Sequence, residues 1–190
     1  NPRFIGYQIC GTASYSSILA YLSTVSFFMI DVFALPPQYF GYAFAVSVAG
    51  FMVGALLCSR LVIHIGMDNT LALGMALTFG AAVGQWLFAT ADTLHTEALA
   101  ACSFTLFFGI GLTSANAAMG AVSLFPKVAG AASAIFGFVH AVIAAATGFL
   151  AGQLYDGTLL PTTSIMFASS AVGLLGIPLA RGLLGGKDNR

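Results

Sequence analysis

The chain has 190 residues, of which 59% are hydrophobic and only 6% are charged, and its formal net charge is zero. This composition excludes a soluble domain, and it argues against nucleic-acid binding because no basic run is present. It is typical of a helical membrane protein, since lipid tolerates neither exposed charge nor unpaired backbone groups.

The three cysteines show no metal-ligand spacing, so we expect small buried side chains, no metal site and no cofactor. The apolar run after Arg3 has the length of a membrane span and does not resemble a cleavable signal peptide. The chain begins at Asn1 without an initiator Met, which suggests a processed or truncated product.

Six apolar stretches are each near the ~20 residues that a helix needs to cross the hydrocarbon core. They are approximately Phe4–Ile30, Tyr39–Cys58, Thr70–Thr90, Ala98–Leu124, Val128–Gly152 and Pro161–Ala180. If successive helices cross the membrane in alternating directions, every Lys and Arg lies on the same side of the membrane as both termini. Asp31, Asp92, Glu97 and Asp156 then lie on the opposite side. The positive-inside rule then makes both termini cytoplasmic. We therefore expect one all-α integral membrane domain, residues 1–190, with six transmembrane helices.

The first predicted helix carries a polar face that ends at its outer end. Its members are Ser14, Ser17, Tyr21, Thr24, Phe28 and Asp31. Tyr21 and Thr24 lie near the helix centre and are candidates to line a substrate cavity, because tyrosine offers both an aromatic face and a hydroxyl. Asp31 is a candidate for the outer mouth, where a carboxylate would attract cations.

The fourth predicted helix places Thr113 and Asn116 on one face with small residues. A buried amide needs hydrogen-bonding partners, so substrate contact and bonding between helices are both open for Asn116. The third and sixth helices carry few polar residues and are expected to support the cavity from outside.

The fifth predicted helix has two distinct lines of residues. Small residues form the first, namely Gly130, Ala134, Gly137, Ala141, Ala144, Gly148 and Gly152, and we expect this side to pack closely against another helix. The second line is polar and aromatic and comprises Ser133, Phe136, His140 and Thr147, which we expect to face a cavity. His140 lies near mid-membrane depth, where ionisable residues usually serve function, so it is also the candidate for proton coupling; simple packing is the alternative.

Four segments, in this order and spacing, resemble the second half of a major facilitator superfamily transporter: FIGY, AYLSTVSFFMIDVFALPPQYFGYAFAV, SRLVIHIG and LFPKVAGAASAIFGF. The likeness covers almost the whole chain and is strongest to the Bcr/CflA-type drug-resistance branch of drug:proton antiporters. It implies a fold of two six-helix halves around a shared cavity, of which this chain is the C-terminal half. The link Ser59–Asn69 is similar to the signature loop of the family, which makes Arg60, Gly66 and Asp68 candidates for a cytoplasmic gate.

The resemblance implies efflux of small amphipathic molecules coupled to protons across the bacterial inner membrane. The implied partners are membrane lipid, a small-molecule substrate, protons and the missing N-terminal half, which is expected to hold the coupling carboxylate. An enzyme is not expected, because no nucleophile stands in a catalytic setting with a histidine. A half-sized transporter or channel acting as a homo-oligomer, and uptake of a small metabolite, remain alternatives.

Overall fold

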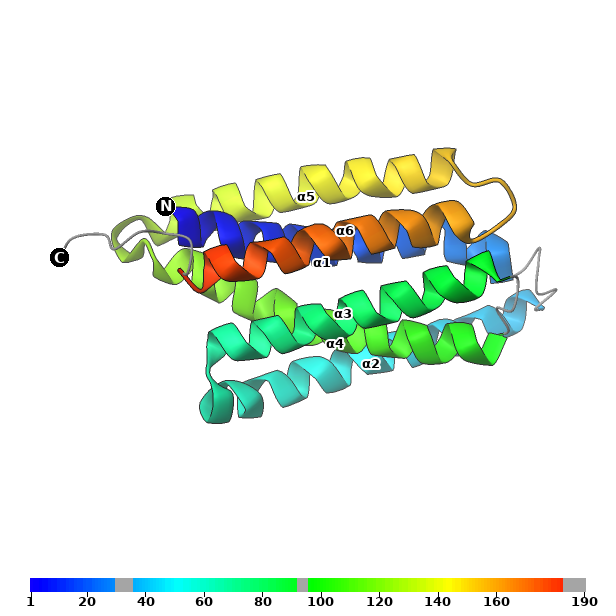
Figure 1. The fold of residues 1–190 in the computed structure, drawn as a ribbon, viewed down its shortest axis with the longest axis horizontal. Helices are drawn as coiled ribbons and strands as arrows, with labels where there is room; N and C mark the ends of the chain where they lie inside the picture. The colour runs from blue at the N-terminus through cyan, green and yellow to red at the C-terminus, as the bar shows by residue number, and fades with distance from the viewer. Residues whose placement is uncertain (30–35, 92–95, 183–190) are drawn as a thin grey trace.

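The computed structural model describes residues 1–29, 36–91 and 96–182, and these form a bundle of six long helices (Figure 1). The helices are α1 (Pro2–Phe27), α2 (Pro37–Ile65), α3 (Met67–Thr90), α4 (Thr96–Ser123), α5 (Ala129–Gln153) and α6 (Leu160–Ala180), with a short 3-10 helix η2 (Pro126–Val128). The described residues contain no β-strand, which confirms the all-α expectation.

Short polar residues, prolines and one glycine define the helix ends. The Asn1 side chain accepts a 3.0 Å hydrogen bond from the Arg3 backbone N–H, and Pro2 occupies the first turn, so α1 begins with a capped end. Proline also stands in the first turn of α2 and of α6, where its missing N–H costs nothing.

The connection between α2 and α3 is much shorter than predicted. The prediction placed a link at Ser59–Asn69, but α2 continues to Ile65 and α3 begins at Met67. No helix breaker stands between Ser59 and Ile65, and the chain reverses at Gly66, whose φ of 83° favours glycine. The predicted link is therefore wrong, and Arg60 belongs to the last turns of a helix.

The helix α1 lies at the centre of the bundle, packed against α4, α5 and α6, while α4 packs against α2 and α3 (Figure 1). The crossing of α1 and α6 is so close that a Cβ on Gly6 would lie 2.7 Å from the Cα of Ala180. At the same end, Arg3 Nε donates a 3.0 Å hydrogen bond to the carbonyl of Ala180. The start of α1 and the end of α6 are thus held together.

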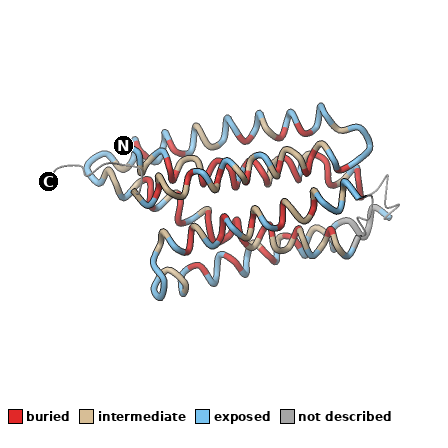
Figure 2. The backbone as a smooth tube through the Cα atoms, in the orientation of Figure 1, coloured by how far each residue is buried: buried red, intermediate tan, exposed pale blue. Residues whose placement is uncertain are grey.

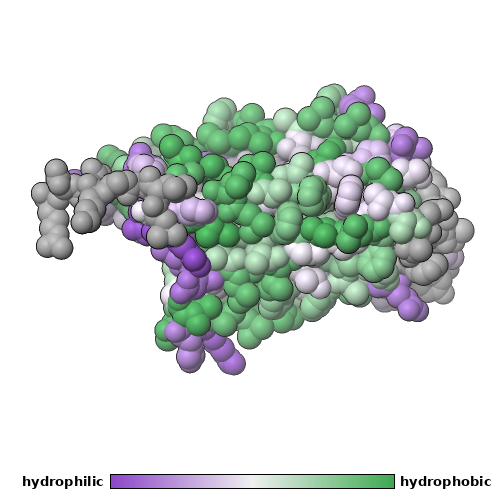
Figure 3. Space-filling view, viewed as in Figure 1, coloured by the Kyte–Doolittle hydropathy of each residue, from purple (hydrophilic) through white to green (hydrophobic). Residues whose placement is uncertain are grey.

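Five of the described helices are long and apolar enough to cross a membrane, in agreement with most of the predicted spans. They are α3, α6 and the stretches Phe44–Ile65, Glu97–Ser123 and Pro126–Gln153, and hydrophobic residues cover the middle of the face drawn in Figure 3. The helix α1 is long enough but not apolar enough to be counted with these five, because hydroxyl side chains are frequent along it. Since α1 is surrounded by other helices, it needs less apolar surface than they do.

The small-residue line of α5 packs only in part as predicted. Gly130, Gly137 and Gly152 have no atom within 4 Å of an added Cβ, and α5 is drawn mostly as exposed in Figure 2. The buried residues of α5 are Ala132, Phe136, Ala144, Gly148 and Ala151. Two members of the small-residue line, Ala144 and Gly148, therefore pack within this chain, and the prediction holds only in part.

Candidate functional site

A cavity of about 250 Å³ lies where α1, α2, α4 and α5 meet. Its lining combines aromatic, aliphatic and hydroxyl side chains, namely Gly11, Ser14, Tyr15, Ile18, Phe51, Ile110, Ser114, Ala118, Phe136 and His140. None of these side chains carries a permanent charge. The site therefore suits a compact molecule with apolar surface and a few hydrogen-bonding groups.

Two small residues make room for the aromatic wall of this cavity. A Cβ on Gly11 would lie 2.7 Å from Cζ of Phe136 and 3.3 Å from the Cβ of Ala117. The ring of Phe136 is consequently buried against α1, between α1 and α4. A larger residue at position 11 would displace this ring and change the cavity's shape.

The imidazole of His140 forms an aromatic cluster with two neighbouring rings. Its centroid lies 4.3 Å from that of Tyr15 at an interplanar angle of 30°, and 5.6 Å from that of Phe136. The side-chain atom Nδ1 of His140 is buried and has no hydrogen-bond partner among the described residues. Because buried polar atoms are nearly always paired, this nitrogen is an exception in the described part of the chain.

Of the predicted cavity residues, the structure brings Phe136 and His140 together at this site. Thr147 lies on the other side of the α1–α5 contact, where it lines a separate groove, and Ser133 is exposed to the surroundings of the chain. The role of all four in binding a substrate stays a prediction.

The predicted residues of α1 and α4 are bonded within the interior of the bundle. The Tyr21 hydroxyl lies 3.4 Å from Ser47 Oγ, and Thr24 accepts a 3.0 Å hydrogen bond from Thr162. The amide of Asn116 donates to the carbonyl of Leu112 at 2.8 Å and to the sulfur of Cys58 at 3.2 Å. Thr113 donates to the carbonyl of Gly109 at 3.0 Å. Tyr21, Thr24 and Asn116 thus bond to a neighbouring helix, whereas Thr113 bonds to its own helix, and substrate contact by these four side chains stays a prediction.

The residues predicted for a cytoplasmic gate lie apart from the cavity. Asp68, in the first turn of α3, forms an ion pair with Arg3 at 3.4 Å and accepts a short hydrogen bond from the Tyr7 hydroxyl. Arg60 is exposed on α2 and has no side-chain partner within the described part of the chain, while Gly66 forms the turn. Asp68 thus pairs with the first helix rather than with Arg60. Asp31, predicted at the outer mouth, lies outside the described residues.

Tyr15 is the functional candidate that the sequence did not single out. Its ring lies nearer to His140 than that of Phe136 does, yet Tyr15 lies beside the polar face of α1 rather than on it. The position of Gly11 one turn earlier was the available signal, because a glycine there allows a ring from another helix to approach.

Among the described residues, no group of three His, Cys, Asp or Glu side chains could hold a metal ion, and Cys10, Cys58 and Cys102 are free thiols. The lining of the cavity offers aromatic contact and hydrogen bonding.

No family model matches the chain, and no solved structure matches it. The chain is similar to a curated protein of Haemophilus influenzae, the bicyclomycin resistance protein homolog, with 26% identity over 172 residues. The match covers 90% of this chain but only 43% of that relative, so the chain spans less than half of the relative's length. The predicted resemblance to a Bcr/CflA-type drug-resistance protein is thereby confirmed, and the chain is a membrane-integral helical protein similar to one part of it.

Proposed function

We propose that this chain is one half of a secondary transporter that exports small amphipathic molecules by alternating access, driven by protons. The observation that carries the proposal is the cavity at His140, where four helices supply aromatic rings and hydroxyls without a permanent charge. The similarity to a protein named for bicyclomycin resistance supports efflux of a drug-like molecule rather than catalysis.

The second half of the transporter would cover α2 and α5. In the most apolar stretch of each of these two helices only 22% of the residues are buried, whereas in that of α4 50% are buried. Large side chains such as Leu56 and Phe138 are about 70% exposed there, and the small residues of α5 leave space for a close helix crossing. We infer that a second six-helix domain, the N-terminal half, packs on this surface and completes the cavity.

We further infer an inner-membrane location with both termini in the cytoplasm. The turn between α2 and α3 and the start of α1 lie at one end of the bundle, since Asp68 contacts Arg3. Arg3, Arg60 and Lys127 all belong to elements that begin or end there (Figure 1). A positive end of this kind is typical of the cytoplasmic side.

Within this half, His140 is our candidate for proton coupling, because its imidazole faces the cavity and its Nδ1 atom has no partner in the described residues. A carboxylate in the other half would share this role. An exporter of this kind stops working when the proton gradient is dissipated.

The test is transport of a fluorescent amphiphilic cation by the intact protein in everted membrane vesicles, with and without a protonophore. His140→Phe keeps the stack on Tyr15 but removes the nitrogen, and losing one hydrogen bond should raise KM about fivefold. His140→Gln keeps a hydrogen-bonding group and should be less affected in KM, but transport should no longer depend on pH in the same way. Leu175→Val, at an exposed position of α6 that does not line the cavity, is the matched control.

If both His140 variants kept the wild-type KM and pH profile, the substrate would not bind in this cavity during transport. Gradient-dependent transport by a homo-oligomer of this chain alone would show that a second, different half is not needed.

A further inference from the structure

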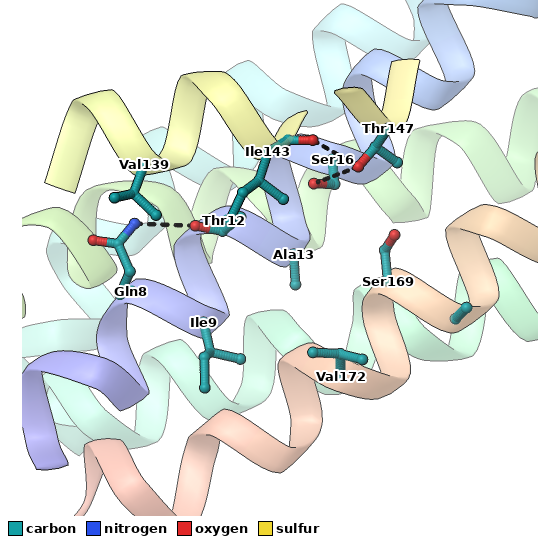
Figure 4. Close-up of a pocket in the computed structure, with 11 residues that line it drawn as sticks. Gln8, Ile9, Thr12, Ala13, Ser16, Val139, Ile143, Thr147, Ser169 and Val172 are labelled. Atoms are coloured by element: carbon teal, nitrogen blue, oxygen red, sulfur yellow. Dashed lines mark hydrogen bonds between the residues drawn. The ribbon is translucent and has the colours of Figure 1, made fainter. Parts of the chain in front are cut away.

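A second hollow lies on the other side of the contact between α1 and α5. The helices α5 and α6 each pack on α1 rather than on each other, which leaves a groove of about 360 Å³ floored by α1 (Figure 4). The α1–α5 contact that separates this groove from the His140 cavity includes a 3.2 Å hydrogen bond from Gln8 Nε2 to the carbonyl of Phe136. The groove is therefore a separate site.

The groove opens toward the membrane. Its rim carries Ile143, 47% exposed, and Val172, 53% exposed, from two helices that are each apolar enough to span a bilayer. In a membrane-integral chain such a rim faces hydrocarbon, so whatever fills the groove enters from the lipid phase.

Hydroxyl groups on the walls of the groove distinguish it from a plain gap between helices. Most serine and threonine hydroxyls in α1 donate to the carbonyl four residues earlier, as Ser14 and Ser17 do at 2.9 and 3.1 Å. Thr12, which is 7% exposed, makes no such bond within the described residues and only accepts a 3.0 Å hydrogen bond from Gln8. Its own proton thus has no acceptor in the described part of the chain.

Ser169 shares this property, whereas Ser16 does not. Thr147 donates its single proton to the carbonyl of Ile143 at 2.8 Å, so its oxygen can accept the proton of Ser16, whose Oγ lies 3.4 Å away. Ser169, on α6, has no hydrogen bond among the described residues, and its hydroxyl points into the space between α5 and α6 (Figure 4). Hydroxyl donors therefore meet in the groove from two helices.

We propose that this groove binds a small amphiphile dissolved in the membrane, one with an apolar body and two hydrogen-bond-accepting oxygens such as ester or ketone carbonyls. The oxygens pair with Thr12 and with Ser169, and the apolar body contacts Ile9, Val139 and Val172. The proposal requires only this packing of helices and does not depend on the transport function proposed above.

An ordinary phospholipid does not fit these donors. Thr12 lies near the middle of α1, which runs from Pro2 to Phe27, about 15 Å along the axis from its start. The ester groups of lipids stay near the ends of a spanning helix, so only their hydrocarbon tails would reach this depth. A hydrocarbon tail would leave the hydroxyl donors unpaired, which is costly in an apolar medium.

The experiment is photolabelling of the intact protein in its native membrane vesicles with two matched probes. The first is a medium-chain alkyl diazirine that carries a diester head, and the second is the same alkyl diazirine without oxygen. Mass spectrometry of the labelled peptides locates each probe. We expect the diester probe to label residues around Ile9–Ala13 and Ala168–Val172 several-fold more than the hydrocarbon probe does.

Three variants sharpen the result. Thr12→Val combined with Ser169→Ala should lower labelling by the diester about fivefold or more, without changing labelling by the hydrocarbon probe. Ser17→Ala removes a hydroxyl of the same helix that is already bonded to the Ala13 carbonyl, so it should change neither signal. Val172→Trp fills the groove from an exposed position and should abolish both signals.

Equal labelling by the two probes in the wild type would mean that lipid tails alone occupy the groove, and the proposal would be wrong. Absence of labelled peptides from the groove would equally overturn it, because the groove would then be closed in the membrane. Either failure would leave the proposed transport through the His140 cavity untouched, since labelling here does not measure transport.

Discussion

The crossing of α3 and α4 offers a test of the fold with a control in the same helix. A Cβ on Gly74 would lie 2.6 Å from the carbonyl oxygen of Gly109 and 2.9 Å from the Cβ of Leu112. The first of these atoms is backbone, so Gly74→Ala would force the helices apart by roughly 0.8 Å, and overpacking of this kind costs about 1–3 kcal/mol. Gly80→Ala is the control, because an added Cβ there meets nothing within 4 Å.

The two substitutions should change the free energy of unfolding in opposite directions. Alanine is a better helix former than glycine by up to about 1 kcal/mol, so Gly80→Ala should be neutral or stabilising. For a domain of this size a loss of ~2 kcal/mol corresponds to a melting temperature roughly 4–8 °C lower for Gly74→Ala. The measurement is thermal unfolding of the intact protein in detergent. Equal melting temperatures for the two variants would refute the close crossing of α3 and α4.

Two further predictions concern the ends of the bundle. The coupling free energy between Asp68 and Arg3 should be less than about 1 kcal/mol, because both members of this ion pair are partly exposed. A double-mutant cycle with Asp68→Asn and Arg3→Gln measures it, and a clearly larger value would contradict this. Hydrogen bonds from the hydroxyl and the backbone N–H of Thr158 hold the pKa of Asp156 below its ordinary value. The turn before α6 is therefore stabilised above about pH 4, and this contribution disappears as the pH falls through the lowered pKa. Hydrogen exchange of the Thr158 amide should accelerate in that acidic range, and Asp156→Ala should remove the change.

The sequence predicted the features of the fold that depend on local chemistry. Apolar runs of span length predicted the helices, and the last predicted span began at Pro161, which the structure places in the first turn of α6. The length of α2 was missed because Ser59 and Arg60 were interpreted as a loop, although polar residues near a helix end do not stop it. A glycine with positive φ does, and Gly66 was the better signal.

The candidate site was predicted in part. Phe136 and His140 were identified from their shared face on α5, and the structure places both at one cavity. Which line of α5 packs could not be predicted from periodicity, because a pattern of small residues shows where a close neighbour is possible but not which chain supplies it. Tyr15 was missed for a related reason: its contact with His140 depends on how α1 and α5 are rotated against each other, which no local pattern encodes.

The polar residues of α1, which like α5 lines both hollows, explain why this helix is not recognised as a membrane span from its hydropathy. Ser14 and Ser17 return their protons to the helix backbone and need no partner from outside. Tyr15 faces the His140 cavity, whereas Thr12 and Ser16 face the groove between α5 and α6. A helix at the lipid surface could not carry these groups, because hydrocarbon would leave them unpaired. The position of α1 among four other helices removes that constraint, so its low hydropathy follows from its central place and from the two hollows that it lines.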